Sequence, residues 1–193
     1  MAAPLTSGGW FKRYTPEEMV STTSQCKSSV ARSIRARLLQ DFPAIEDVID
    51  ELMPKKSPTI LAKAQNHLQL LLGPDGEVLF FQHRDSAWFP TLKLVHRYPQ
   101  LGATWQVDKG AIPYVLGGSN VFCGGLKNAG GNIDADLKHG QPVIVMAQGK
   151  KHACCVGMVK MTPDEIRENT KGVAIETLHY LNDGLWLSPT VVS

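Results

Sequence analysis

Long apolar segments are missing from this chain of 193 residues. A membrane-spanning helix needs roughly 20 consecutive, mostly apolar residues, and no run in the sequence approaches that length. Residues 1–9 are small and uncharged, without the basic start and apolar stretch of a secretory signal or the arginines of a transit peptide. We therefore expect a cytoplasmic protein in which residues 1–9 form a flexible extension.

Cysteine pairs at metal-binding spacing are also missing. The four cysteines, at positions 26, 123, 154 and 155, are scattered and show no C-x-x-C spacing. Without a signal sequence, this usage favours free thiols over a disulfide framework or a zinc site. We expect no metal.

A strong excess of one charge is lacking as well. The net charge is +2; residues 1–101 hold twelve Lys or Arg against ten Asp or Glu, and residues 102–193 hold eight against eight. Tight binding to a duplex by neutralising phosphates alone would need many more cations. Any contact with nucleic acid must therefore depend on local clusters and on shape.

Recognised catalytic motifs are absent too. The sequence has no glycine-rich phosphate loop of the P-loop type and no dinucleotide fingerprint after an expected strand. Cys123, Cys154 and Cys155 fall in expected buried strands, and no histidine is marked as their base. The polar triplet at 83–85 is weak evidence for acid–base chemistry. We predict that the protein is not an enzyme and needs no cofactor.

The first half of the chain mixes helical and strand patterns. Thr15 and Pro16 begin a helix, apolar residues recur at helical spacing over about 26–40, and Pro43 precedes a second amphipathic helix at 45–52. Strands and one further helix are expected at 59–64, 67–72, 78–81 and 91–98. Helices on a small sheet make an α+β domain, which we assign to residues 10–101.

The second half is richer in glycine and consists mostly of short strands and turns. Strands are expected at 120–126, 141–146 and 153–159, with a short helix ending at Gly117, a capped helical turn from Thr162 and a closing strand and turn at 179–186. This pattern indicates a small barrel or sandwich over residues 102–187, followed by a tail at 188–193. The two domains are expected to pack as one rigid body.

Three neighbouring motifs carry a resemblance to a known RNA-binding module. They are VDKGAI at 107–112, VLGGSNV at 115–121 and Gly125-Leu126. Together they resemble the opening of a PUA domain, a pseudo-β-barrel found in pseudouridine synthases and archaeosine transglycosylases. The resemblance implies a pre-PUA domain packed on a C-terminal PUA domain.

A closer resemblance extends over both halves. WFKR at 10–13, MPKK at 53–56, FPTLKL at 89–94 and LHYLNDGLW at 178–186 are similar to motifs of the malignant T-cell-amplified sequence protein family, in the same order. The sequence departs from that family at Gly124, where proline is usual, and in the loop 127–137. These departures affect the expected geometry of RNA contact and leave the fold unchanged.

The family resemblance implies a function in translation. It implies a non-enzymatic RNA-binding factor that acts on the small ribosomal subunit and its rRNA, forms a heterodimer with a density-regulated-protein-like partner, and promotes reinitiation and release of deacylated tRNA. The PUA groove would contact tRNA, and the partner would dock on the N-terminal domain. No membrane and no small-molecule substrate are implied.

Candidate RNA-binding residues are basic positions at exposed turns and helix edges, with a glycine that permits close backbone approach. They are Lys109, Gly110, Ala111, Lys150, Lys151, His152, Lys55, Lys56, Lys93 and Arg97. Lys93, His96 and Arg97 are three or four residues apart, so they share one side of a helix. Arg32 and Arg35 are more simply a solvated helix face.

Three aromatic residues, Trp88, Phe89 and Trp105, are candidates for docking the partner. The same residues would equally serve as packing between the two domains, which is the reading the sequence favours. Two other functions stay open: a protein-docking adaptor whose PUA fold binds no RNA, and a PUA-containing accessory of RNA modification. The balanced charge of residues 102–193 favours the adaptor, and the clustered lysines oppose it.

Overall fold

The N-terminal domain is one antiparallel sheet with helices against it. The computed structural model describes residues 8–169 and 171–191. The sheet has the order β1-β2-β3-β4-β5, with strands β1 (Val20–Gln25), β2 (Ile60–Ala64), β3 (Leu68–Leu72), β4 (Val78–His83) and β5 (Phe89–Pro90). The helices are α1 (Pro16–Met19), α2 (Ser28–Asp41), η1 (Pro43–Ile45), α3 (Ile49–Leu52), η2 (Gln65–His67) and α4 (Leu92–Arg97).

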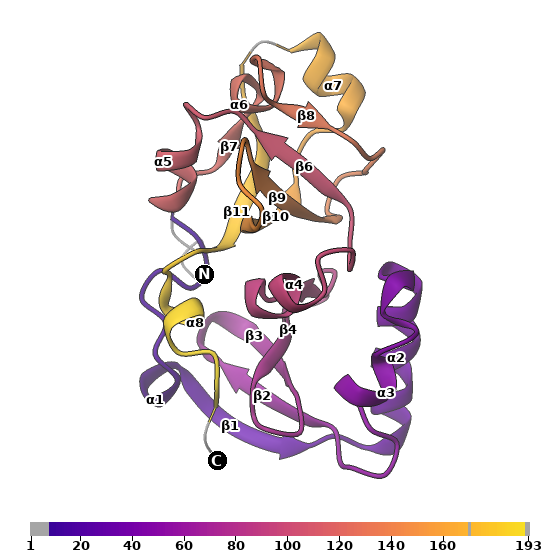
Figure 1. Cartoon of the computed structure of the whole chain (residues 1–193). Helices are drawn as coiled ribbons and strands as arrows, with labels where there is room; N and C mark the ends of the chain where they lie inside the picture. The colour runs from indigo at the N-terminus through magenta and orange to yellow at the C-terminus, as the bar shows by residue number, and fades with distance from the viewer. Residues whose placement is uncertain (1–7, 170, 192–193) are drawn as a thin grey trace.

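The second domain is a curled sheet of six strands with short helices at its edges (Figure 1). Its order is β7-β11-β10-β9-β6-β8, with β6 (Thr104–Val107), β7 (Val121–Phe122), β8 (Asn132–Ile133), β9 (Pro142–Ala147), β10 (Ala153–Val159) and β11 (Val173–Tyr180). Among the named strands of the described residues, β6 and β9 pair in parallel and the other pairs are antiparallel. Its helices are α5 (Ile112–Leu116), α6 (Cys123–Lys127) and α7 (Pro163–Glu168), whereas α8 (Gly184–Leu187) follows β11 and lies beside the N-terminal domain in Figure 1. The expected α+β fold with a C-terminal pseudo-barrel is confirmed.

Each domain has a core of its own, and a third apolar cluster joins them. The joining cluster combines Phe81 and Phe89 of the N-terminal sheet with Ile144, Val156 and Leu178 of the second sheet. Burial of this much apolar surface is the main force that favours one packed unit.

Both ends of the described chain strengthen the connection between the domains. The Trp10 N–H donates to the Leu178 carbonyl (2.8 Å), and the Val78 N–H donates to the Pro189 carbonyl (2.8 Å). Val191 is buried, and Thr190 forms a bridge with Glu77. Residues 188–191, expected to be a tail, are therefore packed on the N-terminal domain; the expected extension lies outside the described residues except for Gly8 and Gly9.

Three local expectations were wrong. The run 120–126 is a short strand followed by α6, because only Val121 and Phe122 pair with β11. The strand β1 was not expected, since five of its six residues are exposed and carry no apolar alternation. The closing strand begins at Val173, earlier than expected, and the segment after Asp183 is the helix α8.

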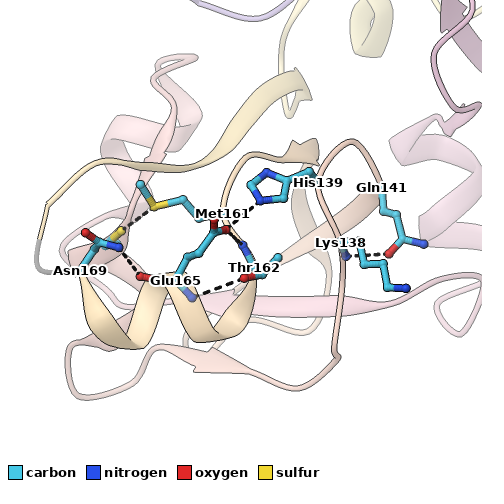
Figure 2. A network of polar contacts seen from close by, with 8 residues as sticks. Lys138, His139, Gln141, Met161, Thr162, Glu165 and Asn169 are labelled. Carbon is cyan, nitrogen blue, oxygen red and sulfur yellow. Dashed lines mark hydrogen bonds and ion pairs between the residues drawn. The ribbon is translucent and has the colours of Figure 1, made fainter.

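The far end of the second domain is held by a polar network around α7 (Figure 2). Thr162 accepts from the Glu165 N–H (3.4 Å), and the Glu165 carboxylate accepts from the Thr162 N–H (2.7 Å), which is the reciprocal capping box. His139 lies 2.8 Å from the same carboxylate. The expected capped helical turn is thus present.

Within the part of the chain that the structure describes, no helix is long and apolar enough to cross a membrane. The longest, α2, has 14 residues, and much of its surface is polar.

Candidate nucleic-acid interface

The N-terminal domain meets the second sheet through α4 and the turn between β9 and β10. The His96 ring of α4 stacks on the His152 ring of that turn, with centroids 4.9 Å apart and an interplanar angle of 27°. Nε2 of His96 lies 2.8 Å from the Ala153 carbonyl oxygen. Because a carbonyl can only accept, Nε2 carries the proton that is shared. Burial lowers the pKa of His96, and the charges of His152 and Lys93 act in the same direction.

Lys93 lies one turn before His96 and faces the same junction. Its Nζ stands 3.9 Å from the centroid of the Trp186 ring, in cation–π geometry. Trp186 belongs to α8, and its ring also meets His96 edge-on at 5.1 Å. The Trp186 ring, itself packed on His96, therefore fixes the direction of Lys93.

The Lys109 loop is connected to the same turn by the parallel pairing of β6 with β9. Val107 pairs with Ala147, so the ends of both strands lie together. The Lys109 N–H donates to Oε1 of Gln148 (3.0 Å), and the Gln148 N–H donates to the Val107 carbonyl (3.0 Å). Gln148 precedes the lysines at 150 and 151, so the Lys109 loop and the lysine turn form one surface.

We name this surface the basic strip and define it as Lys93, Lys109, Lys150, Lys151 and His152. Lys109, Lys150, Lys151 and His152 are exposed, and Lys93 is half-buried. In the described part of the chain, none of the four lysines has an ion-pair partner. The strip therefore offers four cationic groups that an anionic chain could neutralise.

The two small residues next to Lys109 differ in their surroundings. A Cβ added at Gly110 would meet only the Asp108 carboxylate, at 3.5 and 3.9 Å, so the protein itself leaves space there. Ala111 packs partly against the core of the second domain, and its N–H donates to Oδ1 of Asp108 (3.0 Å). Gly110 is thus exposed on the Lys109 loop, and Ala111 anchors this loop to the core of the second domain.

Lys55 and Lys56 lie elsewhere, in the connection between α3 and β2. With Arg32 and Arg35 they line an open groove of about 700 Å³ beside α2. Arg35 forms an ion pair with Asp50, and the Lys55 Nζ lies 3.5 Å from the same carboxylate. The side chains at 55 and 35 are thus partly neutralised. In Figure 1, α2 and α3 lie well away from α5, which follows the Lys109 loop.

Arg97 does not join the basic strip. Its guanidinium donates to Oε2 of Glu77 (2.6 Å), and Glu77 is buried. This hydrogen bond raises the pKa of Arg97 above its ordinary value. The arginine compensates a buried carboxylate inside the N-terminal domain and is not part of the basic strip.

The three aromatic candidates are all buried. Trp88 belongs to the N-terminal core, Phe89 to the cluster that joins the domains, and Trp105 to the core of the second domain. Only Phe89 therefore packs between domains, and none offers a surface on which a partner could dock. Large exposed apolar side chains instead occur at Val30, Tyr114, Leu116, Phe122 and Leu187.

The chemistry of the cysteines does not favour nucleophilic catalysis. Burial raises the pKa of Cys154 to about 12 and raises that of Cys155 well above its ordinary value. Burial also raises the pKa of Cys26. A thiol is reactive as its thiolate, and these environments oppose ionisation.

Both domains match known families. The Pre-PUA-like domain family matches residues 14–99, and the PUA domain family matches residues 104–181. The chain thus has a pre-PUA domain followed by a PUA domain. A PUA-domain crystal structure from Aeropyrum pernix has the same fold, with a TM-score of 0.65 and 21% identity, covering 90% of this chain and 99% of that one. A hypothetical protein from Pyrococcus horikoshii gives a TM-score of 0.68 at 22% identity, covering 86% and 98%.

Sequence relatives define the family. The chain is 45% identical over 181 residues to malignant T-cell-amplified sequence 1 homolog of Drosophila melanogaster, covering 94% of this chain and 99% of that protein. It is 43% identical over 176 residues to malignant T-cell-amplified sequence 2 of Homo sapiens, covering 91% and 96%. The chain belongs to the malignant T-cell-amplified sequence family, which confirms the resemblance. It is an RNA-binding, translation-related protein.

Proposed function

We propose that this protein is a non-enzymatic translation factor that binds rRNA of the small ribosomal subunit and tRNA in the cytoplasm. With a density-regulated-protein-like partner, it promotes reinitiation and the release of deacylated tRNA. One observation carries the RNA-binding surface: the Lys109 loop, the lysine turn and α4 meet in the basic strip, although they lie far apart in the sequence.

The strip suits recognition of a phosphate chain. Lysines at turns and helix edges act as point charges on phosphates, and they position a nucleic acid without reading its sequence. His152 adds an exposed ring beside them. The RNA contact is thus proposed to lie where the PUA domain adjoins α4, with Lys55 and Lys56 as a separate contact beside α2.

Reversing two charges of the basic strip tests this proposal. We expect Lys109→Glu/Lys150→Glu to weaken binding to purified small subunits about 10- to 100-fold and to flatten its salt dependence. Co-sedimentation over a range of salt concentrations measures both quantities. The control Lys138→Glu/Lys171→Glu makes the same change in net charge at two exposed lysines outside the strip. Equal binding by both double variants would contradict the RNA-contact assignment.

The adaptor function differs from this proposal in one respect. An adaptor would reach the ribosome through its partner, so the strip variant would keep full recruitment once the partner is added. A direct RNA binder would lose recruitment under both conditions. An accessory of RNA modification would bind free RNA with no preference for small subunits.

The partner surface is proposed to include α5. Tyr114 is 69% exposed and Leu116 is 38% exposed, although both are large and apolar. Such residues on one short helix are typical of a docking site. We thus propose a partner contact on the PUA domain, whereas from the sequence we expected it on the N-terminal domain.

A charge on α5 tests the partner surface. We expect Tyr114→Asp to weaken partner binding by roughly 2 kcal/mol or more, because it inserts a carboxylate into an apolar contact. Isothermal titration with the purified partner measures the loss. Leu187→Asp is a matched control, since Leu187 is 68% exposed on α8. The surface is wrongly placed if the control loses as much affinity as Tyr114→Asp.

A further inference from the structure

The outer face of the N-terminal sheet ends in a cavity of about 430 Å³ that shares no residue with the basic strip. We name it the sheet-end pocket and define it by its polar lining: Ser21, Lys63, His67, Gln69, Arg84 and Asp85. Three of these side chains are basic, and Asp85 supplies the one carboxylate among them.

Strand register explains how three of the polar side chains come together. Lys63 of β2 pairs directly with Gln69 of β3, so both side chains stand on the same face of the sheet. The neighbours of Lys63, Ala62 and Ala64, point into the core. Ser21 lies at an irregularity between the pairs formed by Val20 and Thr22, where β1 carries an extra residue. Such bulges redirect a side chain.

The Ser21 hydroxyl is held at a defined position. It donates to the carbonyl oxygen of Lys63 (3.0 Å), which fixes it above the neighbouring strand. Its one proton is used in that hydrogen bond, so the hydroxyl shapes the pocket without supplying a free donor. The bulge thus builds one wall of the pocket.

The two loops at this end of the sheet have unusual backbones. Asn66, His67 and Arg84 have φ values of 58°, 60° and 52°, in the left-handed region that residues other than glycine rarely adopt. They are three of the four such residues in the described ranges, the other being Asn182. Conformations of this kind cluster at binding sites, where the surrounding structure maintains them.

A direct hydrogen bond couples these loops. The Arg84 N–H donates to the His67 carbonyl (3.2 Å), and the Ser86 hydroxyl accepts from the His83 N–H (3.2 Å). The arginine and the histidine are therefore presented by loops that hold each other. Their side chains are exposed, so the fold gains no core packing from them.

Two cationic side chains of the pocket are not neutralised by the described residues. In the described ranges, neither Lys63 nor Arg84 forms an ion pair. Burial lowers the pKa of the neighbouring His83, and the Arg84 and His67 side chains act in the same direction. A guanidinium, an ammonium and an imidazole beside the Gln69 amide supply donors that match the acceptors of a phosphate.

We propose that the sheet-end pocket binds a phosphate group of RNA, as a contact on the N-terminal domain additional to the basic strip. This inference rests on the proposed function, because it gives the same RNA ligand a point of attachment beyond the basic strip and the Lys55–Lys56 contact. Separated phosphate contacts fix the orientation of a protein on a nucleic acid.

Opposite charge changes in the pocket test the proposal. We expect Lys63→Gln/Arg84→Gln to bind small subunits about tenfold more weakly and to lower the slope of log affinity against log salt by roughly 1 to 2. Asp85→Asn should bind more tightly than wild type, because it removes the carboxylate that faces the ligand. Lys138→Gln/Lys171→Gln is the control for net charge, and urea unfolding verifies that all variants fold equally.

The possible outcomes distinguish a failure of this inference from a failure of the proposed function. If wild type binds small subunits and Lys63→Gln/Arg84→Gln matches the control in affinity and slope, the pocket binds no phosphate. A weaker affinity with an unchanged slope also overturns it, since that would indicate a protein contact. If wild type binds no small subunits, the proposed function fails. In that case, NMR titration with a single-stranded RNA oligonucleotide, followed at the Arg84 and His67 amides, tests phosphate binding in the pocket. Chemical-shift changes that occur in wild type and are lost in the double variant support the proposal. The absence of such changes in wild type overturns it.

Discussion

Replacement of Asp183 by alanine is expected to lower the free energy of unfolding by about 3–5 kcal/mol. Asp183 is 1% exposed, and its carboxylate accepts from Nδ1 of His179 (2.8 Å), from the Tyr180 N–H (3.0 Å) and from the Trp186 N–H (2.9 Å). Its removal leaves three buried donors without an acceptor and removes the cap of α8. Urea unfolding at neutral pH measures the loss.

A double-mutant cycle measures the coupling free energy between Asp183 and His179. His179 is fully buried, and its Nε2 has no partner among the described residues. We expect His179→Ala/Asp183→Ala to cost clearly less than the sum of the single changes, because the second change removes a group already left unpaired. Additive losses would show that the two side chains are not coupled. A loss below about 1 kcal/mol for Asp183→Ala alone would contradict its role as a buried acceptor.

Periodic apolar segments were the predictable part of the fold. The helix expected at about 26–40 is α2 at Ser28–Asp41, and the strands expected at 59–64, 67–72 and 78–81 are β2, β3 and β4. These elements each bury one face against a core, so the repeat of their apolar residues reflects the structure directly. The strand β1 lies at the sheet edge with nearly all its side chains exposed, and no such repeat marks it.

The candidate site was predictable residue by residue, but its assembly was not. Lysines at turns drew attention to Lys109, Lys150 and Lys93. Their proximity depends on the parallel pairing of β6 with β9 and on the stacking of His96 with His152, both of which join distant segments. The sequence also could not show that Arg97 is held by Glu77, twenty residues away.

The sheet-end pocket could not be predicted from the sequence, for a different physical reason. Its features are a one-residue bulge at Ser21 and left-handed backbones at His67 and Arg84. Glycine or asparagine normally marks such conformations, and only Asn66 gives that signal here. The polar triplet at 83–85 gave only weak evidence for acid–base chemistry, and its residue types do not mark a left-handed turn.

Replacement of Gly184 by alanine is expected to destabilise the protein by about 3 kcal/mol or more. A Cβ at this position would lie 2.6 Å from the Tyr14 nitrogen and 2.8 Å from its carbonyl carbon, and closer still to the carbonyl oxygen. The Gly184 N–H also donates to the Phe11 carbonyl (2.8 Å). Because these neighbours are backbone atoms, relief requires the segment 10–14 to move, which exposes the buried Phe11 and Tyr14.

A second glycine provides the matched control for this prediction. A Cβ at Gly124, within α6, would meet nothing within 4 Å, so Gly124→Ala should stabilise the protein by roughly 0.5–1 kcal/mol through lower entropy of the unfolded chain. Urea unfolding compares the two variants, and hydrogen exchange at the Trp10 amide reports whether the N-terminal segment detaches. If Gly184→Ala unfolds like wild type, Gly184 does not pack against the Tyr14 backbone. If both variants lose stability equally, the loss reflects a general cost of replacing glycine, and the steric argument is wrong.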